Sequence, residues 1–511
     1  MKESIPPILR PDHVTPVHFS NLVRHFTLEQ YRAGEAALTG ISMNTADLRA
    51  GDLFVAMPGL KTHGANFAAK AIELGAAAII TDAAGAELID ADLPIAILEN
   101  PRQHLGELAA FVYGNSEGNL PLLFGTTGTN GKTSTTYLLE AMLRQLGRVT
   151  GLTSTAERHI AGEVIVSRLT TPESTEMHAL IARMREKQVS AIAVEVSAQA
   201  MTQQRVDGLH FDVVGFTNLS HDHLDDYGNM ENYFGAKALL FRPEHASRGV
   251  VCLDTSYGAR LVEQSEIPVV TITHLDDVAA DYIVEVLQQT PEFTEFKLYS
   301  QTGETLVSRI PIIGAHMAYN AGLAIAMLVE AGFAFDEIAD AIADGINVYM
   351  PGRTELVSGK RGPNVFVDFG HSPDAFLNTL AAVRSVTTGK VIMVFGADGD
   401  RDATKRPDMA RVSAEGCDLL VITDHHPRFE DPASIRATLV ASARQARPEL
   451  EIHEVSPPEA AIRLAVSLAA EGDSILWAGP GHQDYRDIRG VRTVYSARQE
   501  ARDALREAGW T

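Results

Sequence analysis

The residues best suited to chemistry lie between positions 125 and 134, where the string GTTGTNGKTS follows an apolar run. A glycine-rich turn between a strand and a helix start lets backbone N–H groups face phosphate oxygens, and Lys132 can reach the β- and γ-phosphates of a nucleotide. The hydroxyl of Thr133 can hold Mg²⁺. A strict phosphate-loop motif has glycine at position 126, where this chain has threonine. The residues that we expect to bind a nucleotide here are Gly128, Thr129, Asn130, Gly131, Lys132, Thr133 and Ser134.

Three further side chains could assist phosphate chemistry. Glu195 ends the apolar run AIAVE, His223 follows the run VVGFTNLS, and Lys237 lies in the segment YFGAKALLF. Each of them alone is more often an ordinary surface residue. With the phosphate loop they suit a reaction in which ATP converts a carboxylate, a poor acyl donor, into an acyl phosphate that an amine then attacks. Catalysis of this kind rests on positioning and on neutralising negative charge.

The elements around these residues predict an α/β protein with three domains. Apolar runs alternate with amphipathic helical stretches after Pro121, which is typical of a phosphate-loop ATPase-like parallel sheet with crossover helices. The β-rich runs NVFVDFG, KVIMVFGAD, DLLVITD and DSILWAG predict a doubly wound, Rossmann-like sheet near the C-terminus. We expect a small N-terminal α/β domain at residues 1–118, a central ATP-binding domain at 119–348 and a C-terminal domain at 349–511.

The composition indicates a folded protein and disfavours several classes. A chain of 511 residues needs more than one core, and 45% hydrophobic with 21% charged residues is ordinary for a globular protein. The formal net charge of −23 disfavours nucleic acid or an anionic membrane as a partner. Only Cys252 and Cys417 occur, so neither a disulfide scaffold nor a zinc site is expected. Without a signal-peptide pattern or a long apolar run, we expect a cytoplasmic protein.

Three segments, taken in order, resemble the central-domain motifs of the Mur ligase family, most closely its E type: TGTNGKT, EVSAQAMTQQRV and FTNLSHDHLDDYGNMENYFGAK. The resemblance implies an ATP-dependent ligase with ATP and Mg²⁺ as cofactors. It assigns Glu195 and His223 to Mg²⁺ beside Thr133. It also implies that Lys237 is carbamylated, which gives an anionic side chain for a second metal ion. The expected catalytic residues are Lys132, His223, Lys237 and Arg353.

The resemblance extends to residues that bind a UDP-linked muramoyl peptide. Where the family usually has Ser-Ser-His, this chain has Ser197, Ala198 and Gln199. The segment ISMNTADLRAGDLF resembles the family's UDP-binding segment, with Thr45 at the serine position but Ala46 in place of the arginine. The alternative for this segment is a structural strand and turn. The residues implied to contact the substrate are Thr45, Thr170, Thr171, Ser197, Gln203 and Arg205.

The segments MPGRTE, VDFGHSPDA and GADGDRDATKR resemble family segments that close over ATP. The resemblance implies that Arg353 meets the γ-phosphate, that Asp368 meets the ribose and that His371 lies near the nucleotide. Asn320 matches an adenine-side asparagine, although its usual asparagine neighbour is Met317 here. The resemblance therefore spans nearly the whole chain.

The expected amino-acid site departs from the pattern of family members that use meso-diaminopimelate. Arg401 in GDRD matches a position that binds the α-carboxylate of the incoming amino acid, a task suited to a planar guanidinium. HHPR replaces DNPR and GPGHQ replaces GKGHE, so His426 and Gln483 stand where an asparagine and an acidic residue are usual. Loss of that carboxylate weakens the attraction for a distal ammonium group. The residues implied to bind the amino acid are Arg401, His426, Arg428, Gly479 and Gln483.

We therefore expect a ligase of peptidoglycan synthesis that adds a third amino acid to UDP-N-acetylmuramoyl-L-alanyl-D-glutamate. Its partners would be this muramoyl dipeptide and a free amino acid, and we expect a monomer. Lysine, ornithine, another diamino acid or homoserine is favoured over meso-diaminopimelate. The alternatives are a folylpolyglutamate synthase or another Mur-type ligase, and a non-catalytic regulatory homologue. TTPESTEMH and the EVS segment disfavour the first, and the retained phosphate-loop lysine and metal-binding residues disfavour the second.

Overall fold

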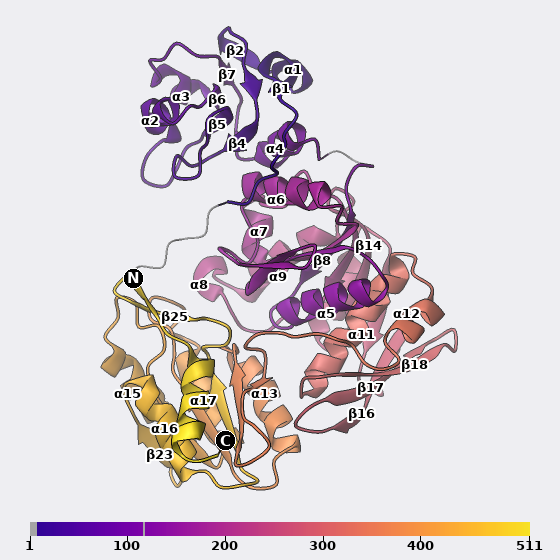
Figure 1. Cartoon of the computed structure of the whole chain (residues 1–511), viewed down its shortest axis with the longest axis vertical. Helices are drawn as coiled ribbons and strands as arrows, with labels where there is room; N and C mark the ends of the chain where they lie inside the picture. Colours follow the sequence, from indigo (N-terminus) through magenta and orange to yellow (C-terminus); the bar gives the residue numbers. More distant parts are fainter. Residues whose placement is uncertain (1–7, 116–117, 511) are drawn as a thin grey trace.

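The computed structural model describes residues 8–115 and 118–510, and three sheets organise them. Figure 1 shows three units in a row, with a five-stranded sheet at one end, an eleven-stranded sheet in the middle and a six-stranded sheet at the other end. The expected three-domain α/β architecture is confirmed. Positions 116 and 117, next to the boundary expected at residue 118, lie outside the described residues, as do positions 1–7, on which the expectation of no signal peptide partly rests.

The N-terminal unit is built on a sheet with the order β2-β7-β6-β5-β4, which is parallel except for β2. Leu53 and Val55 face a core shared with α1 and α4, whereas Phe54 faces α2 on the other side. Ala179 and Ala182 of the central unit join the first of these cores, so the two units share an apolar contact. The elements are β1 (Val17–His18), α1 (Phe19–His25), β2 (Glu29–Arg32), β3 (Ala37–Leu38), β4 (Gly40–Ser42), β5 (Asp52–Ala56), η1 (Gly64–Phe67), α2 (Ala68–Glu73), β6 (Ala78–Thr81), α3 (Ala83–Glu87), β7 (Ile95–Ile97) and α4 (Leu105–Tyr113).

The central sheet has the order β11-β10-β9-β12-β8-β13-β14-β15-β16-β17-β18. The strands from β9 to β16 in this order are parallel, as the sequence predicts, and antiparallel hairpins extend both edges. At one hairpin, Ala161 and Gly162 both have positive φ, the backbone twist that joins two adjacent antiparallel strands in a two-residue turn. The strands are β8 (Leu122–Thr127), β9 (Thr150–Thr153), β10 (Glu157–Ile160), β11 (Glu163–Val166), β12 (Ala191–Glu195), β13 (Phe211–Phe216), β14 (Ala246–Cys252), β15 (Val269–Thr273), β16 (Tyr282–Gln289), β17 (Thr294–Ser300) and β18 (Thr305–Ile310).

Helices cover both faces of the central sheet because neighbouring strand residues point to opposite sides. Phe124 and Val213 face a core with α5, α11 and α12, whereas Leu123 and Val214 face a core with α6, α7, α9 and α10. The helices are α5 (Lys132–Gln145), α6 (Ser174–Glu186), α7 (Ala198–Thr202), α8 (Leu224–Tyr227), α9 (Met230–Ala238), η2 (Leu239–Phe241), α10 (Ser256–Gln264), α11 (Ala315–Glu330) and α12 (Phe335–Ala341).

The C-terminal unit has a sheet with the order β19-β20-β24-β21-β22-β23, parallel except for β19. Helices α13, α14 and α15 cover one face, and α16 and α17 cover the other. The arrangement is doubly wound, as the sequence predicts. The elements are β19 (Glu355–Leu356), β20 (Asn364–Asp368), α13 (Pro373–Ser385), β21 (Val391–Phe395), α14 (Arg406–Gly416), β22 (Leu419–Ile422), α15 (Pro432–Ala446), β23 (Glu451–Glu454), α16 (Pro458–Leu468), β24 (Ser474–Ala478), β25 (Tyr485–Ile488), β26 (Val491–Val494) and α17 (Ala497–Glu507).

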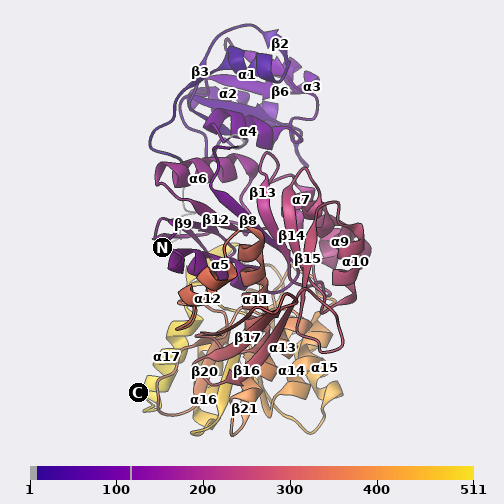
Figure 2. The ribbon, with the colours of Figure 1, turned by 90° about the vertical axis from the view of Figure 1, so that its right-hand side faces the viewer.

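The central and C-terminal units meet next to α11 and α13, which lie close together in both views (Figures 1 and 2). Ile313, just before α11, packs into the C-terminal core, and Met350 still packs into the central core. The domain boundary at residues 348 and 349 therefore stays a prediction within a shared contact region. Across the described ranges, no helix combines the length and the apolar character that crossing a membrane requires.

Candidate active site between two sheets

One cavity of about 770 Å³ lies between the central and C-terminal units. Its walls include the loops that follow β8, β12, β13, β20, β21, β22 and β24, and open α/β sheets bind ligands at these carboxyl ends. The volume suits a small-molecule site. The expected residues that line the cavity are Thr129, Asn130, Gly131, Lys132, Thr133, Ser134, Thr170, Glu195, Ser197, Arg205, His223, Asn320, Arg353, Asp368, His371, Arg401, Arg428, Gly479 and Gln483.

The other expected residues lie off the cavity wall. Gly128, Thr171, Gln203 and His426 each share a hydrogen bond with a residue that lines it. Thr45 lies in the turn after β4 in the N-terminal unit, away from this cavity. The structure therefore does not bring Thr45 together with the other expected residues.

The phosphate loop joins β8 to α5 through two glycines that have no room for a side chain. Gly128 has a φ of 144°, and a Cβ there would lie 1.9 Å from Oγ1 of Thr217. Gly131 has a φ of 86°, and a Cβ there would lie 2.5 Å from Oδ1 of Asn320. The amine of Lys132 folds over the loop and donates to the carbonyl oxygen of Gly128 at 3.1 Å. The loop thus places the ammonium group of Lys132 next to the N-terminus of α5.

Glu195 and Thr133 meet at the cavity wall. Thr133 donates from Oγ1 to Oε2 of Glu195 at 3.0 Å, and Thr155 donates to the same carboxylate from N at 2.8 Å and from Oγ1 at 3.0 Å. Arg353, from the C-terminal unit, donates from Nη2 to Oγ1 of Thr133 at 2.8 Å. A hydroxyl and a carboxylate are oxygen ligands of the kind that Mg²⁺ prefers, so this pair fits the expected metal.

Lys237 is buried beneath the phosphate loop. Its Nζ donates to the carbonyl oxygen of Gly128 at 2.6 Å and lies 4.5 Å from the centroid of the Tyr233 ring. Burial, followed by the positive charge of Lys132, lowers the pKa of Lys237 well below its ordinary value. Among the described residues, no carboxylate lies within ion-pair distance of this amine. The environment therefore favours an uncharged amine.

Buried contacts that the sequence did not single out join the two units beside the loop. Lys405 Nζ lies 3.0 Å from Oδ1 of Asp222, and Asn130 Nδ2 donates to Oδ2 of Asp374 at 2.9 Å. Burial of Asp222 would raise its pKa, but the charges of His371 and Lys405 outweigh burial and lower that pKa. Asp222 and Lys405 stand within the segments HDHLD and ATKR, but the sequence does not tell that they meet.

His223 and His371 reach the same region from different units. The Nε2 atoms of the two rings lie 3.7 Å and 4.0 Å, respectively, from Oδ2 of Asp222. Asp368 lies at the cavity wall, but its Oδ1 accepts from the backbone N of Thr354 at 2.8 Å and its Oδ2 from Gly370 at 2.6 Å. Asp368 therefore holds the turn next to Arg353, and its contact with a ribose stays a prediction.

The residues expected at the muramoyl peptide surround the start of α6 and α7. Ser197 caps α7 by accepting from the backbone N of Ala200 at 3.1 Å. Arg205 Nε lies 2.9 Å from Oε1 of Glu173, whose other oxygen accepts from Arg102 of the N-terminal unit at 2.7 Å. Glu173 thus links Arg102 of the N-terminal unit to Arg205, a residue that we expect to contact the substrate.

On the C-terminal side of the cavity, Gln483 shares a hydrogen bond with His426, which lies just off the wall. Gln483 Oε1 lies 2.8 Å from Nε2 of His426, and the backbone N of Asp487 donates to Nδ1 of the same ring at 3.0 Å. Arg428 donates from Nη1 to the carbonyl oxygen of Gly399 at 3.0 Å. Two side chains that the sequence did not single out, Asp398 and His425, line this end as well.

Family models match three stretches of the chain: "Mur ligase family, catalytic domain" at residues 37–113, "Mur ligase middle domain" at 126–328 and "Mur ligase, glutamate ligase domain" at 352–481. A relative from Leifsonia xyli subsp. xyli, named UDP-N-acetylmuramyl-tripeptide synthetase, is 54% identical over 99% of each chain. A relative from Streptomyces coelicolor, named UDP-N-acetylmuramoyl-L-alanyl-D-glutamate–2,6-diaminopimelate ligase, is 41% identical over 93% of this chain and 94% of its own.

A solved structure titled as a UDP-N-acetylmuramoyl-L-alanyl-D-glutamate–2,6-diaminopimelate ligase superimposes with a TM-score of 0.65 and 26% identity. It covers 93% of this chain and 96% of its own. The family models together match well over half of the chain, and the relatives match nearly all of it. The chain therefore belongs to the Mur ligase family and, like the members of that family, is an ATP-dependent ligase.

Proposed function

We propose that this ligase adds the third amino acid to UDP-N-acetylmuramoyl-L-alanyl-D-glutamate in peptidoglycan synthesis. One observation carries the proposal: a single cavity is lined by the phosphate loop and Glu195 of the central unit and by Arg401, Arg428 and Gln483 of the C-terminal unit. A nucleotide and an amino acid can thus meet there on the two sides of a peptide carboxylate. The names of the relatives support the same substrate.

The cationic groups of the cavity would neutralise the phosphates of ATP. Lys132 lies over the loop and Arg353 reaches Thr133 from the opposite unit, so two positive charges would face the terminal phosphate of a bound nucleotide. Burial lowers the pKa of Arg353, yet a guanidinium stays charged at neutral pH. Charge placed in advance in a site of low dielectric stabilises a phosphoryl-transfer transition state strongly.

Thr133 and Glu195 would hold Mg²⁺, with His223 as a further expected ligand. The metal ion would supply positive charge to the phosphate oxygens. Lys237, buried next to the loop without a carboxylate partner among the described residues, is the amine expected to be carbamylated. Intact-mass and peptide mass spectrometry of the purified protein at neutral pH would detect this adduct.

The peptide end of the substrate would lie between α6 and α7. Arg205 and Ser197 line the cavity there, and Glu173 fixes the guanidinium of Arg205. The free carboxylate of the D-glutamate would point toward the phosphate loop and receive the phosphoryl group. The amine of the incoming amino acid would then attack the acyl phosphate and expel inorganic phosphate.

The third amino acid is the finer part of the proposal. Relatives whose names give an amino acid are named for 2,6-diaminopimelate, so they give no support to lysine, and the Leifsonia relative has a name that leaves the residue open. In this chain Gln483 offers an amide that is already bonded to His426. We infer an amino acid other than meso-diaminopimelate, taken from ornithine, lysine, a shorter diamino acid and homoserine.

A purified-enzyme assay tests the proposal. The chain is incubated with UDP-N-acetylmuramoyl-L-alanyl-D-glutamate, ATP, MgCl₂ and one amino acid at a time, and phosphate release and product mass are measured. We expect release that depends on both the dipeptide and an amino acid. Turnover with a folate and glutamate, and none with the muramoyl dipeptide, would instead support a folylpolyglutamate synthase.

A further inference from the structure

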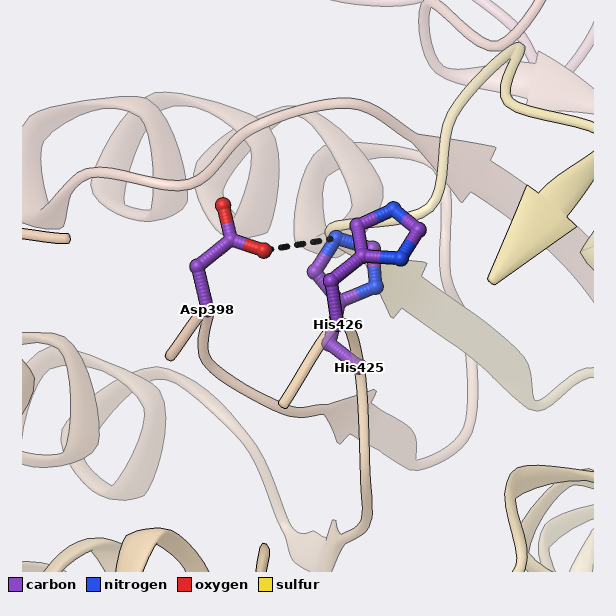
Figure 3. Close-up of side chains that lie close together, drawn as sticks. All are labelled: Asp398, His425 and His426. Atoms are coloured by element: carbon purple, nitrogen blue, oxygen red, sulfur yellow. Dashed lines mark ion pairs between the residues drawn. The ribbon is translucent and has the colours of Figure 1, made fainter. Parts of the chain in front are cut away.

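Asp398 places a negative charge at the amino-acid end of the cavity. It follows β21, lines the cavity and faces the adjacent rings of His425 and His426, which follow β22 (Figure 3). Its Oδ1 is buried and has no hydrogen-bond partner within residues 8–115 and 118–510. Nε2 of His425 lies 3.8 Å from this oxygen, which is too long for a hydrogen bond. A buried carboxylate oxygen without a donor is costly unless a ligand supplies one.

The three side chains are grouped closely enough to hold a metal ion, but their bonding disfavours one. The backbone N of Asp487 donates to Nδ1 of His426, so Nε2 of that ring carries the proton and donates to Gln483. His426 therefore has no lone pair left for a metal. The guanidinium of Arg428 also lies 3.7 Å from Oδ2 of Asp398, which opposes a second, doubly charged cation.

An ammonium group fits this position better. It carries one charge and three donors, and it can donate to the unsatisfied oxygen of Asp398. Burial lowers the pKa of His425 to about 3, so its ring is neutral and can accept a second hydrogen bond. Burial would raise the pKa of Asp398, but the positive charge of Arg428, 3.7 Å from its Oδ2, lowers that pKa.

We propose that Asp398 is a specificity-determining residue that receives the distal ammonium group of an incoming diamino acid. This inference rests on the proposed function and narrows its amino acid. Arg401 would take the α-carboxylate, and the distal amine would reach the carboxylate between His425 and Arg428. The charge that Gln483 lacks is thus supplied by Asp398, which follows the neighbouring strand β21.

The same arrangement disfavours a distal carboxylate. Asp398 lies beside Arg428 and cancels part of the positive charge that a second carboxylate would need. A carboxylate brought to this point would also face Asp398 itself, and like charges at this distance repel. The site therefore selects a diamino acid with one carboxylate over diaminopimelate, and a charged amine over the neutral hydroxyl of homoserine.

The test compares the wild-type enzyme with Asp398→Asn and Asp398→Glu across 2,4-diaminobutyrate, ornithine, lysine, homoserine and meso-diaminopimelate. In the wild type we expect one of the three monocarboxylic diamino acids to have the highest kcat/KM. For Asp398→Asn we expect KM for that amino acid to rise about 10- to 100-fold, the range for loss of a charge-assisted hydrogen bond. Asp398→Glu should restore turnover and shift the preference toward a shorter side chain. Asp408→Asn, at an exposed carboxylate on α14 that pairs with Arg411, is the matched control.

Several outcomes would overturn the inference. These are a wild-type preference for meso-diaminopimelate or homoserine, an unchanged KM in Asp398→Asn, or Zn²⁺ binding in calorimetry that Asp398→Asn abolishes and that competes with the amino acid. The thermal midpoint of each variant shows whether it is folded. If no amino acid supports turnover with the muramoyl dipeptide while the wild type is folded and binds ATP, the proposed function itself fails, which is a distinguishable result.

Discussion

Arg353 donates a hydrogen bond to the hydroxyl of Thr133 across 220 positions of the chain, and this bond connects the C-terminal unit to the first turn of α5. The guanidinium also lies over the Phe369 ring, with 4.5 Å between Cζ and the ring centroid. The bond can form only when the two units are closed on each other. Arg353 therefore reports closure and contributes charge at the same place.

Replacement of Arg353 by alanine should lower kcat by a factor on the order of 10²–10³, the cost of one preorganised donor in a charge-stabilising site. Arg353→Lys keeps the charge but loses the planar fork, so we expect it to recover only part of the rate. Phosphate release under saturating substrates measures both variants. Arg361→Ala, at an exposed arginine nearby, is the control. A kcat within about twofold of wild type for Arg353→Ala would contradict this role.

Replacement of Lys132 by alanine should lower the turnover rate by at least roughly 10²-fold, so that turnover is no longer measurable. Burial lowers the pKa of this amine, so its charge is held at a cost in the free protein. We therefore expect the thermal midpoint of Lys132→Ala to be equal to or above that of wild type. Lys187→Ala, at an exposed lysine in the same unit, should change neither quantity. Unchanged phosphate release in Lys132→Ala would refute the assignment of the loop.

The ion pair between Asp222 and Lys405 should couple domain closure to catalysis. Removing one partner of a buried pair leaves an unpaired charge, which costs about 3–5 kcal/mol when it stays buried. Here the charge can return to water if the units separate. We therefore expect Asp222→Asn and Lys405→Met each to reduce kcat/KM for ATP clearly, while the thermal midpoint changes little. In the double variant, the free-energy loss calculated from kcat/KM should be smaller than the sum of the losses in the two single variants. Strictly additive effects on kcat/KM would show that the pair is not coupled.

The phosphate loop could be predicted from local sequence patterns. Contacts between residues that lie far apart in the sequence could not, for a physical reason. The strand, the turn and the helix from residue 122 to 145 are determined by neighbouring residues, because glycine at positions 128 and 131 fits the positive φ angles and the lack of space in the turn. In contrast, Lys405 and Asp222 lie 183 positions apart, and only the packing of two sheets brings them together.

The sequence predicted the amino-acid site only in part, because this site too combines residues that lie far apart in the chain. The sequence drew attention to Gln483 as a lost charge, but it could not show that Asp398 lines the same cavity, since these residues follow different strands. The antiparallel hairpins at the edges of the central sheet were also not anticipated. In β17 and β18 buried residues alternate with less buried ones, and β11 is largely exposed, so these strands lack the continuous apolar runs of the buried parallel strands.

His159 predicts a loss of stability at alkaline pH. Its ring lies between Glu140 and Glu157, with 3.3 Å from Nδ1 to the first carboxylate and 3.3 Å from Nε2 to the second. Burial alone would lower the pKa of His159, but the hydrogen bonds and charges of the two carboxylates raise it to about 9. A folded-state pKa above the unfolded value means that the protonated ring stabilises the fold fully below pH 6.5, and that this contribution is lost as the pH rises through about 9.

Replacement of His159 by glutamine removes this titration, so the variant should be destabilised most at pH 6 and least at pH 10. We expect a difference of about 2 kcal/mol at pH 6, discounted for partial solvent access from the full linkage value. Thermal unfolding of both proteins at several pH values measures the gap between their midpoints. His13→Gln, at an exposed ring, controls for the loss of any histidine. A gap that stays constant from pH 6 to pH 10 would mean that the His159 ring is not charged in the folded protein, because only a protonated ring gives a contribution that disappears in this window.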